Sequence, residues 1–217
     1  MTPSFDDARL RTKMVKTQLS KRGICDKRVL EVMGVIPRHL FVPEAFRKHA
    51  YEDKPLGIGQ GQTISQPFMV ALMTQLLKLK AEDVVLEVGT GSGYQAAILA
   101  SLCRKVISIE RHKALADSTH ACLKAQGFDT IDVRVGDGSL GVADEALFDA
   151  IVVTAGGPEI SETLKHQLKV GARMVCPVGD REAQDLMVVT REKNCFVTQR
   201  HSRCRFVPLL GEEGWNE

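Results

Sequence analysis

The sequence predicts an α/β fold with a doubly wound, mostly parallel seven-stranded sheet, an antiparallel C-terminal strand and an N-terminal helical extension. Three observations indicate this architecture. From residue 83 onwards, short apolar runs alternate with helical runs, as in a parallel sheet covered by helices on both faces. A glycine-rich run lies between the first apolar run and the next helix. Near the end, two strand patterns flank a turn-like Lys-Asn pair, which predicts a hairpin.

The first 80 residues are predicted to be mainly helical. Apolar residues between Leu10 and Leu19 recur at roughly helical spacing, which predicts a first helix. Asp26 is a suitable N-cap for a second helix, and a short helix is expected after Pro43. A further amphipathic helix is predicted to begin at Pro67, because proline suits the first position of a helix.

The remaining chain provides the strands and helices of the sheet layer. The predicted strands are 83–88, 105–110, 131–137, 148–155, 171–179, 185–192 and 194–210. The predicted helices between them are 95–103, 112–127 and 158–168, the last of which begins at a proline. The first strand is almost continuously apolar, which is typical of a strand buried on both faces.

Composition excludes several classes of protein. A hydrophobic content of 44% and a charged content of 26% are ordinary for a soluble globular protein, and a net charge of +2 does not favour a dedicated nucleic-acid surface. No run approaches the ~18 apolar residues of a membrane span. Because acids come early in the N-terminal segment and no apolar core follows, we expect no signal peptide.

The cysteines and histidines are scattered along the chain. The six cysteines show no CxxC spacing, so we expect reduced thiols, no disulfides and a cytoplasmic protein. The six histidines include no HxxxH pair, so we expect no metal site. The chain is expected to act as a monomer.

The glycine run follows the first predicted sheet strand directly. Gly89, Gly91 and Gly93 lie where the backbone can approach a ligand closely and where a helix N-terminus presents free amides. The dinucleotide fingerprint GxGxxG would place its third glycine at residue 94, which is Tyr94. The spacing is GxGxG instead, with an acid, Glu87, two residues before it.

Two later strands end in acids that suit a nucleoside. Glu110 can accept both hydroxyls of a ribose, and Asp137 can reach an adenine amino group. Taken singly, Glu110 could be a surface charge and Asp137 a helix cap. Together with the glycine run they resemble the Rossmann-like class I S-adenosylmethionine-dependent methyltransferases. A nicotinamide oxidoreductase is the alternative, but it leaves the GxGxG spacing and Asp137 unexplained.

The run GIGQGQTISQP, residues 57–67, contains hydroxyls and amides but no ionisable side chain. A hydroxyl or amine acceptor needs a base, whereas a carboxylate with a pKa of about 4 is already ionised at neutral pH. Ser65, with Thr63, would lie at a helix N-terminus whose amides favour an anion. On spacing alone, Ser65 could equally be a helix cap. The sequence TAGGP after the fourth sheet strand lacks the Pro-Pro-aromatic motif of enzymes that methylate nucleic-acid bases.

Most of the chain, from VLEVMGVIPRHLFVPEAF to RFVPL, resembles the protein-L-isoaspartate O-methyltransferase family. The GQTISQP run is the most specific part of the likeness. The resemblance implies that residues 1–80 form a helical subdomain with a substrate loop, and that 81–217 form the S-adenosylmethionine-binding domain, within one compact unit. It implies Ser65 as the catalytic residue. It implies cofactor contacts from Glu87, Gly89, Thr90, Gly91, Gly93, Glu110, Arg111, Asp137, Gly138 and Thr154, and substrate contacts from Ile58, Gln62, Thr63, Ile64, Ser65 and Val207.

The resemblance also implies the reaction. A methyl group from S-adenosylmethionine would pass to the free α-carboxylate of an isoaspartyl residue in a damaged protein or peptide, leaving S-adenosylhomocysteine. The ester would then close to a succinimide, whose hydrolysis returns some normal aspartate. Gly57, Gly59 and Gly61 would let the peptide backbone approach closely. A non-enzymatic binding protein for damaged polypeptides is the other alternative, and it leaves the acids Glu110 and Asp137 without a role.

Two positions depart from the family pattern. The family usually has a tryptophan after GDG, where this chain has Ser139. The alanine- and proline-rich sequence that usually follows the fourth strand is here TAGGPEI, with Gly156 and Gly157. The first departure concerns packing on the adenine side, and neither lies in the acceptor run.

Overall fold

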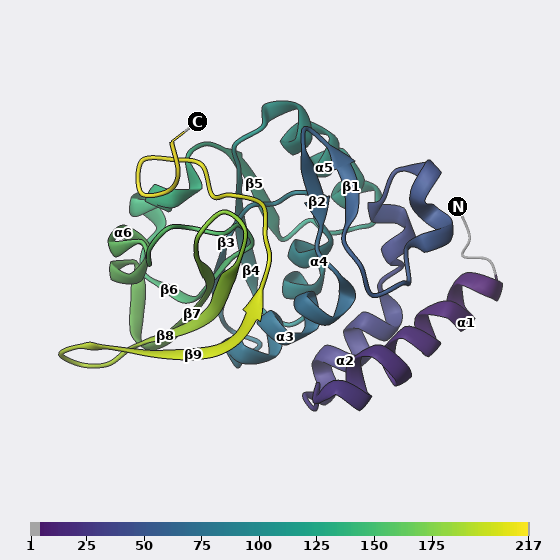
Figure 1. Cartoon of the computed structure of the whole chain (residues 1–217), viewed down its shortest axis with the longest axis horizontal. Coiled ribbons are helices and arrows are strands. Elements are labelled where there is room, and N and C mark those ends of the chain that lie inside the picture. Colours follow the sequence, from purple (N-terminus) through teal and green to yellow (C-terminus); the bar gives the residue numbers. More distant parts are fainter. Residues whose placement is uncertain (1–4, 217) are drawn as a thin grey trace.

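A seven-stranded sheet forms the centre of the protein in the computed structural model, which describes residues 5–216 (Figure 1). Its strands are β3 (Val84–Val88), β4 (Lys105–Glu110), β5 (Ile131–Val135), β6 (Phe148–Val153), β7 (Leu168–Gly179), β8 (Gln184–Arg191) and β9 (Phe196–Cys204). Their order is β5-β4-β3-β6-β7-β8-β9. The pairs from β5 to β7 are all parallel, so the predicted doubly wound sheet is confirmed. Residues 1–4 and 217 of the two predicted units lie outside the described residues.

The C-terminal strands form the predicted hairpin. β8 pairs antiparallel with both β7 and β9, so β8 is the strand that runs against the rest of the sheet. The prediction of one strand from 194 to 210 is wrong, because β9 ends at Cys204. The chain then turns back over the sheet, and backbone hydrogen bonds join Gly156 to Val207 (2.8 Å) and to Leu209 (2.9 Å).

Helices cover both faces of the sheet. They are α1 (Phe5–Met14), α2 (Lys27–Val35), α3 (Pro67–Leu77), α4 (Tyr94–Ala100), α5 (Lys113–Ala125) and α6 (Glu162–His166). Successive strand residues point to opposite faces, so Val85 packs in the core cluster with α3 and α4, and Leu86 packs in the cluster with α6. This double burial explains the almost continuous apolar strand sequences.

The N-terminal helices share the core of the sheet layer. Met14 and Val29 belong to the same cluster of buried residues as Val85, although they precede it by more than fifty positions. Asp26 caps α2 as predicted, since its carboxylate accepts hydrogen bonds from the amides of Arg28 (2.9 Å) and Val29 (3.5 Å). In Figure 1 these helices lie at the end of the molecule away from the β8–β9 hairpin.

The start of α6 differs from the prediction. A helix beginning at Pro158 was expected, but α6 begins at Glu162 because Ser161 is its N-cap. The Ser161 hydroxyl accepts the Leu164 amide at 3.0 Å. The preceding residues form a loop in which Gly157 bridges Val178.

The glycine-rich run is a small hairpin formed by β1 (Leu56–Gly59) and β2 (Gln62–Ile64). Its turn has three consecutive residues with positive φ, namely Gly59 (95°), Gln60 (51°) and Gly61 (69°). Glycine suits positions 59 and 61 because residues with a Cβ rarely adopt this conformation, which Gln60 adopts between them. A Cβ at Gly59 or Gly61 would meet nothing within 4 Å. These two glycines therefore serve the turn, and close approach of a peptide backbone at this hairpin stays a prediction.

All six cysteines are unpaired in the structure. Burial raises the pKa of the Cys103 and Cys176 thiols to about 12 and also raises that of Cys122. Cys25 and Cys195 are exposed.

We therefore predict six free thiols in the freshly prepared protein. Under denaturing, non-reducing conditions, mass measurement after alkylation should count six modified cysteines. In the native protein Cys25 and Cys195 should react first, because the thiolate is the reactive form and these two side chains are accessible. A native disulfide would contradict the prediction.

Residues 5–216 contain no helix long and apolar enough to cross a membrane. Within the same residues, no group of three or more His, Cys, Asp or Glu side chains could hold a metal ion.

Candidate active site

A cavity that is open to solvent lies at the carboxyl edge of the parallel strands. The sheet order reverses beside β3, which connects onward to β4 on one side and pairs with β6 on the other. Ligands of doubly wound sheets bind at such a switch point. The predicted site residues that line it are Gln62, Thr63, Gly89, Gly91, Glu110, Arg111, Gly138, Thr154 and Val207.

The glycine loop after β3 is tightly fixed. Gly89, Gly91 and Gly93 have φ angles of +96°, +53° and +83°. A Cβ on Gly89 would lie 2.4 Å from Thr154 Oγ1, which itself donates hydrogen bonds to the carbonyls of Val88 (3.0 Å) and Gly89 (2.6 Å). Both the backbone conformation and the space thus require glycine at position 89.

Glu110 joins the end of β4 to this loop. Its carboxylate accepts hydrogen bonds from the Gly91 amide (2.9 Å) and the His112 amide (3.0 Å), and its side chain is almost fully buried. It also lines the cavity. A carboxylate has about four lone-pair positions, so Glu110 retains capacity to accept hydrogen bonds from a ligand.

Glu87 lies beneath the cavity and does not line it. It is fully buried in β3 and accepts a hydrogen bond from Ser108 Oγ, which is 2.6 Å from Thr90 Oγ1. Burial raises the pKa of the Glu87 carboxyl to about 8, and the nearby charge of Glu110 adds to this effect. At neutral pH Glu87 is therefore mainly protonated, and the chain Glu87–Ser108–Thr90 supports the glycine loop from below.

The protonation of Glu87 predicts a pH-dependent stability. Between pH 4.5, its ordinary pKa, and about 8, the unfolded chain loses this proton while the folded chain keeps it. The free energy of unfolding should therefore fall as pH rises through this window, on the order of 1 kcal/mol per pH unit. Glutamine resembles the protonated acid at every pH, so Glu87→Gln should remove the part of the decrease in the free energy of unfolding that Glu87 causes. Urea unfolding of both proteins at pH 5 and pH 8 measures the difference.

The exposed Glu82 at the other end of β3 provides the matched control. Glu82→Gln should keep the pH dependence of the wild type. If Glu87→Gln and the wild type lose stability in parallel between pH 5 and pH 8, the buried carboxyl is ionised and the assignment is wrong.

Asp137 lies beside the cavity, and its carboxylate is engaged by the C-terminal segment. It accepts hydrogen bonds from the amides of Ser139 (2.9 Å) and Glu212 (2.8 Å) and from Ser139 Oγ (2.7 Å). Partial burial alone would raise the pKa of this carboxyl, but these hydrogen bonds outweigh it and hold the pKa below its usual value. Only Gly138 of the GDG sequence lines the cavity.

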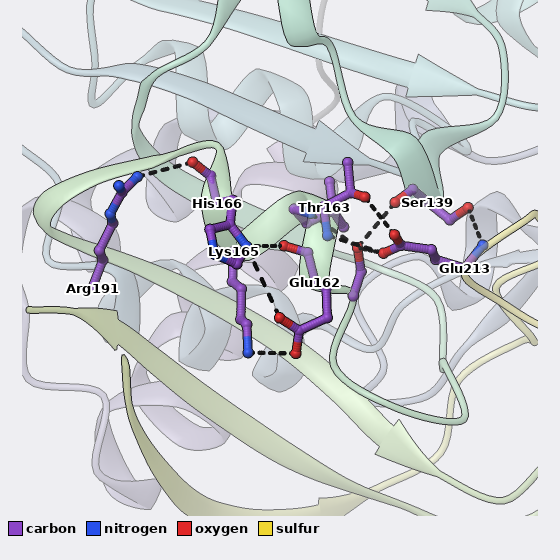
Figure 2. Close-up of polar contacts among 9 residues, drawn as sticks. Ser139, Glu162, Thr163, Lys165, His166, Arg191 and Glu213 are labelled. Carbon is purple, nitrogen blue, oxygen red and sulfur yellow. Dashed lines mark hydrogen bonds and ion pairs between the residues drawn. The ribbon is translucent and has the colours of Figure 1, made fainter. Parts of the chain in front are cut away.

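Glu213 anchors the same segment on its other side. Figure 2 shows its side chain between Ser139 and Thr163. Its carboxylate accepts the Ser161 hydroxyl (2.6 Å) and the Thr163 amide (3.0 Å), and its own amide donates to Ser139 Oγ (3.0 Å). Trp215 adds a hydrogen bond from Nε1 to the Gly156 carbonyl (3.0 Å). The two positions that depart from the family pattern, 139 and 156, are thus both tied to the C-terminal segment.

Ser65 lines a second, smaller pocket. The residues around it are Pro55, Thr63, Ser65, Gln66, Met69, Thr154, Arg205, Phe206 and Val207. Thr63, Thr154 and Val207 line this pocket and the larger cavity alike, so the two spaces adjoin. The pocket is lined by hydroxyl, amide and apolar side chains and one arginine, without a carboxylate or a histidine.

The start of α3 corrects one part of the acceptor prediction. Free amides were expected at this helix N-terminus, but one of them, the Phe68 amide, donates to Asp53 Oδ1 at 3.0 Å. The N-cap of α3 is Gln66, which makes no side-chain cap hydrogen bond, and its Nε2 donates to Asp53 Oδ2 at 3.2 Å. Asp53 thus caps the helix from outside, and the alternative in which Ser65 is the cap is wrong.

The other predicted residues lie around these two pockets. Ile58 approaches the glycine loop, since a Cβ on Gly91 would lie 3.5 Å from Ile58 Cδ1. Ile64 is buried in the core. Thr90 and Gly93 support the loop without lining the cavity.

Sequence reasoning missed several cavity residues. Ile109, Leu209 and Leu210 add apolar walls, and His112 adds a polar one. The positions after β3 and β4 could have been found from their place at strand ends. Leu209 and Leu210 could not, because they were assigned to a strand.

Comparison with known proteins decides the family. A family model described as Protein-L-isoaspartate(D-aspartate) O-methyltransferase (PCMT) matches residues 9–214. The chain belongs to the protein-L-isoaspartate O-methyltransferase family. It is 51% identical to the protein-L-isoaspartate O-methyltransferase of Syntrophus aciditrophicus over 219 residues, covering 100% of both chains. It is 53% identical to protein-L-isoaspartate O-methyltransferase 1 of Syntrophobacter fumaroxidans, covering 94% of this chain and 96% of the relative.

Solved structures of this family have the same fold. One protein-L-isoaspartate O-methyltransferase superimposes with a TM-score of 0.85 at 28% identity, covering 94% of this chain and 67% of the other. A Plasmodium falciparum structure described as a putative protein-L-isoaspartate O-methyltransferase, in complex with S-adenosyl-L-homocysteine, gives a TM-score of 0.80 at 28% identity. The superposition covers 92% of this chain and 98% of the Plasmodium falciparum chain.

The cavity of this family member fits S-adenosylmethionine chemically. Glu110 offers a carboxylate for ribose hydroxyls, and Ile109 and Leu209 offer apolar walls for an adenine ring. The glycine backbone leaves room where a side chain would intrude. Because the ligand carries no phosphate and is positively charged, an acid in the wall is favourable.

Proposed function

We propose that this chain transfers a methyl group from S-adenosylmethionine to the free α-carboxylate of L-isoaspartyl residues in damaged proteins and peptides. The proposal includes the site roles given above: Glu110, Gly89, Gly91 and Thr154 hold the cofactor, and Ser65 with Thr63 holds the acceptor. Residues 1–80 supply the acceptor loop and 81–217 the cofactor site. The observation that supports it most is that the Ser65 pocket adjoins the cavity through three shared lining residues.

The side chains of the Ser65 pocket suit an acceptor that needs no base. S-adenosylmethionine, when bound, supplies a methyl group on a positively charged sulfur. An isoaspartyl carboxylate has a pKa of about 4 and is ionised at neutral pH, so the chain has only to hold and orient it. Ser65 Oγ and Thr63 Oγ1 can each donate one hydrogen bond to a carboxylate oxygen. The apolar residues Met69, Phe206 and Val207 limit water around the acceptor.

The consequence for the substrate is repair. Methoxide leaves an ester far more readily than an oxide ion leaves a carboxylate, so the neighbouring backbone amide nitrogen attacks the ester carbonyl, methanol departs, and the product closes to a succinimide without the enzyme. Hydrolysis of that ring returns part of the material as normal aspartate. Because the pocket has few side chains that could select neighbouring residues, we expect many sequence contexts to be accepted.

The test is methyl transfer from labelled S-adenosylmethionine to matched peptides that differ only in an aspartyl or isoaspartyl linkage. We expect label on the isoaspartyl peptide alone, lost on mild alkaline hydrolysis as expected of an ester. Thermal unfolding with S-adenosylmethionine or with nicotinamide nucleotides tests the oxidoreductase alternative. Protection by the nicotinamide alone, or equal labelling of both peptides, would contradict the proposal.

We further propose that the chain acts as a monomer in the cytoplasm and does not use a metal or bind nucleic acid. Scattered reduced cysteines and a net charge of +2 support this. Sedimentation at several concentrations, activity in the presence of a chelator, and fractionation of the source cells provide the tests.

A further inference from the structure

Arg205 is the charged residue in the wall of the Ser65 pocket. It follows β9 directly, where the chain leaves the sheet edge and turns back towards the cavity. The other lining residues are neutral, as Ser65, Thr63 and Gln66 illustrate. Asp53, which lies close to Gln66, is already engaged by Arg22 and by the Phe68 amide. The pocket wall therefore carries a net positive charge.

The Arg205 side chain is not used to hold the fold. Within residues 5–216 it forms no hydrogen bond or ion pair, and the side chain is exposed. Arg200 on the same edge differs, since it pairs with Asp185 at 2.9 Å. Arg200 is thus matched by an acid, whereas Arg205 faces a pocket whose lining has none. Its charge is available to a ligand.

We propose that Arg205 is a specificity-determining residue that makes the Ser65 pocket select an ionised carboxylate over a neutral amide. This inference rests on the proposed function and adds a contact to it. A guanidinium matches the geometry of a carboxylate, and no acid in the pocket wall competes for it. Ser65 and Thr63 alone would discriminate less, because a hydroxyl can donate to an amide carbonyl as well as to a carboxylate, whereas a guanidinium adds a full opposite charge that only the carboxylate matches.

The inference predicts how the loss of Arg205 affects KM and kcat separately. An arginine stabilises the full negative charge of the bound carboxylate, and that charge decreases as the methyl group is transferred. Arg205 therefore favours the bound acceptor at least as much as the transition state. Removing it should raise KM without lowering kcat. Removing a hydroxyl that orients the reacting oxygen should instead lower kcat.

The experiment measures peptide binding in the presence of S-adenosylhomocysteine, which permits no transfer. The probes are an isoaspartyl peptide and the same peptide with the α-carboxylate replaced by a carboxamide. The wild type should bind the acid more tightly, and Arg205→Gln should weaken binding of the acid about 5- to 20-fold while leaving the amide unchanged. Arg205→Lys should recover part of the preference. In kinetic assays the glutamine variant should show the same rise in KM, with kcat retained.

Arg203→Gln is the matched control, because Arg203 is an exposed arginine two positions earlier that does not line the pocket. It should bind both peptides as the wild type does. If Arg205→Gln keeps the wild-type preference for acid over amide, or if Arg203→Gln loses it equally, the inference is wrong although the proposed function stands. If the wild type neither binds nor methylates the isoaspartyl peptide, the proposed function itself fails. Melting temperatures of all variants exclude a folding defect.

Discussion

Ser65→Ala is expected to slow methyl transfer to an isoaspartyl peptide on the order of 10²-fold, because the reacting oxygen loses a donor that orients it and a misplacement of about 1 Å has an effect of this size. The serine orients an acceptor that is already ionised, so it forms no covalent intermediate and its loss does not abolish the reaction. Because the Phe68 amide is taken by Asp53, the helix terminus offers less compensation than a free one would. The effect should therefore appear mainly in kcat.

Stability separates this role from a structural one. Ser65 does not cap α3, since the N-cap Gln66 has no side-chain cap bond and Asp53 fills that place. Ser65→Ala should thus leave the melting temperature nearly unchanged, whereas loss of a real cap costs about 1 kcal/mol. Initial rates and thermal unfolding of the same preparation measure both quantities.

Two further variants sharpen the result. Ser65→Thr keeps the hydroxyl and should retain more activity than alanine. Ser101→Ala removes an exposed hydroxyl at the end of α4, far along the chain from the acceptor run, and should retain full activity. A Ser65→Ala protein that is less stable yet fully active would assign Ser65 to the fold and not to the acceptor.

The sheet and its helices could be predicted because their signals are local. Apolar runs such as 84–88 are buried on both faces, and their lengths exclude helices. The glycine loop was predictable for the same reason, since Gly89 and Gly93 directly follow a strand and precede a helix. Strand-end acids follow from the parallel topology, which brings carboxyl ends to one edge.

The parts that could not be predicted depend on contacts between distant residues. Asp53 reaches Phe68 fifteen positions away, and no spacing rule connects the two. Glu212 and Glu213 reach Asp137 and Ser139 from the end of the chain. Such long-range hydrogen bonds decide which carboxylates are free for a ligand.

Burial is the other missing information. Glu87 precedes the glycine loop as a cofactor acid would, but its strand buries it completely and raises its pKa to about 8. Residues 205–210 form a mainly apolar run that resembles the end of a strand, yet they leave the sheet edge and line the two pockets, with Val207 in the wall of both. An acid before a glycine loop has the same sequence pattern whether it is buried or lines a cavity, and an apolar run has the same pattern whether it continues a strand or leaves the sheet. Only the tertiary structure distinguishes these cases.

Glu110→Ala is expected to raise the dissociation constant for S-adenosylmethionine by about 1–3 kcal/mol, or roughly 5- to 150-fold, because one partner of charged hydrogen bonds is lost. The structure adds a second consequence. The amides of Gly91 and His112 lose their acceptor, so the glycine loop loosens and the protein becomes less stable. Calorimetric titration well below the melting temperature separates affinity from folding.

The choice of variants distinguishes direct contact with the ribose from support of the loop. Glu110→Gln keeps one oxygen that can accept a loop amide but removes the charge and the second acceptor. If the carboxylate binds the ribose, the glutamine variant should keep most of the stability and still bind the cofactor weakly. If Glu110 only supports the loop, Glu110→Gln should regain cofactor affinity and stability to the same extent, relative to Glu110→Ala. Glu82→Ala, an exposed acid at the opposite end of β3, should change neither. A folded Glu110→Ala protein with wild-type affinity would place the ribose elsewhere in the cavity.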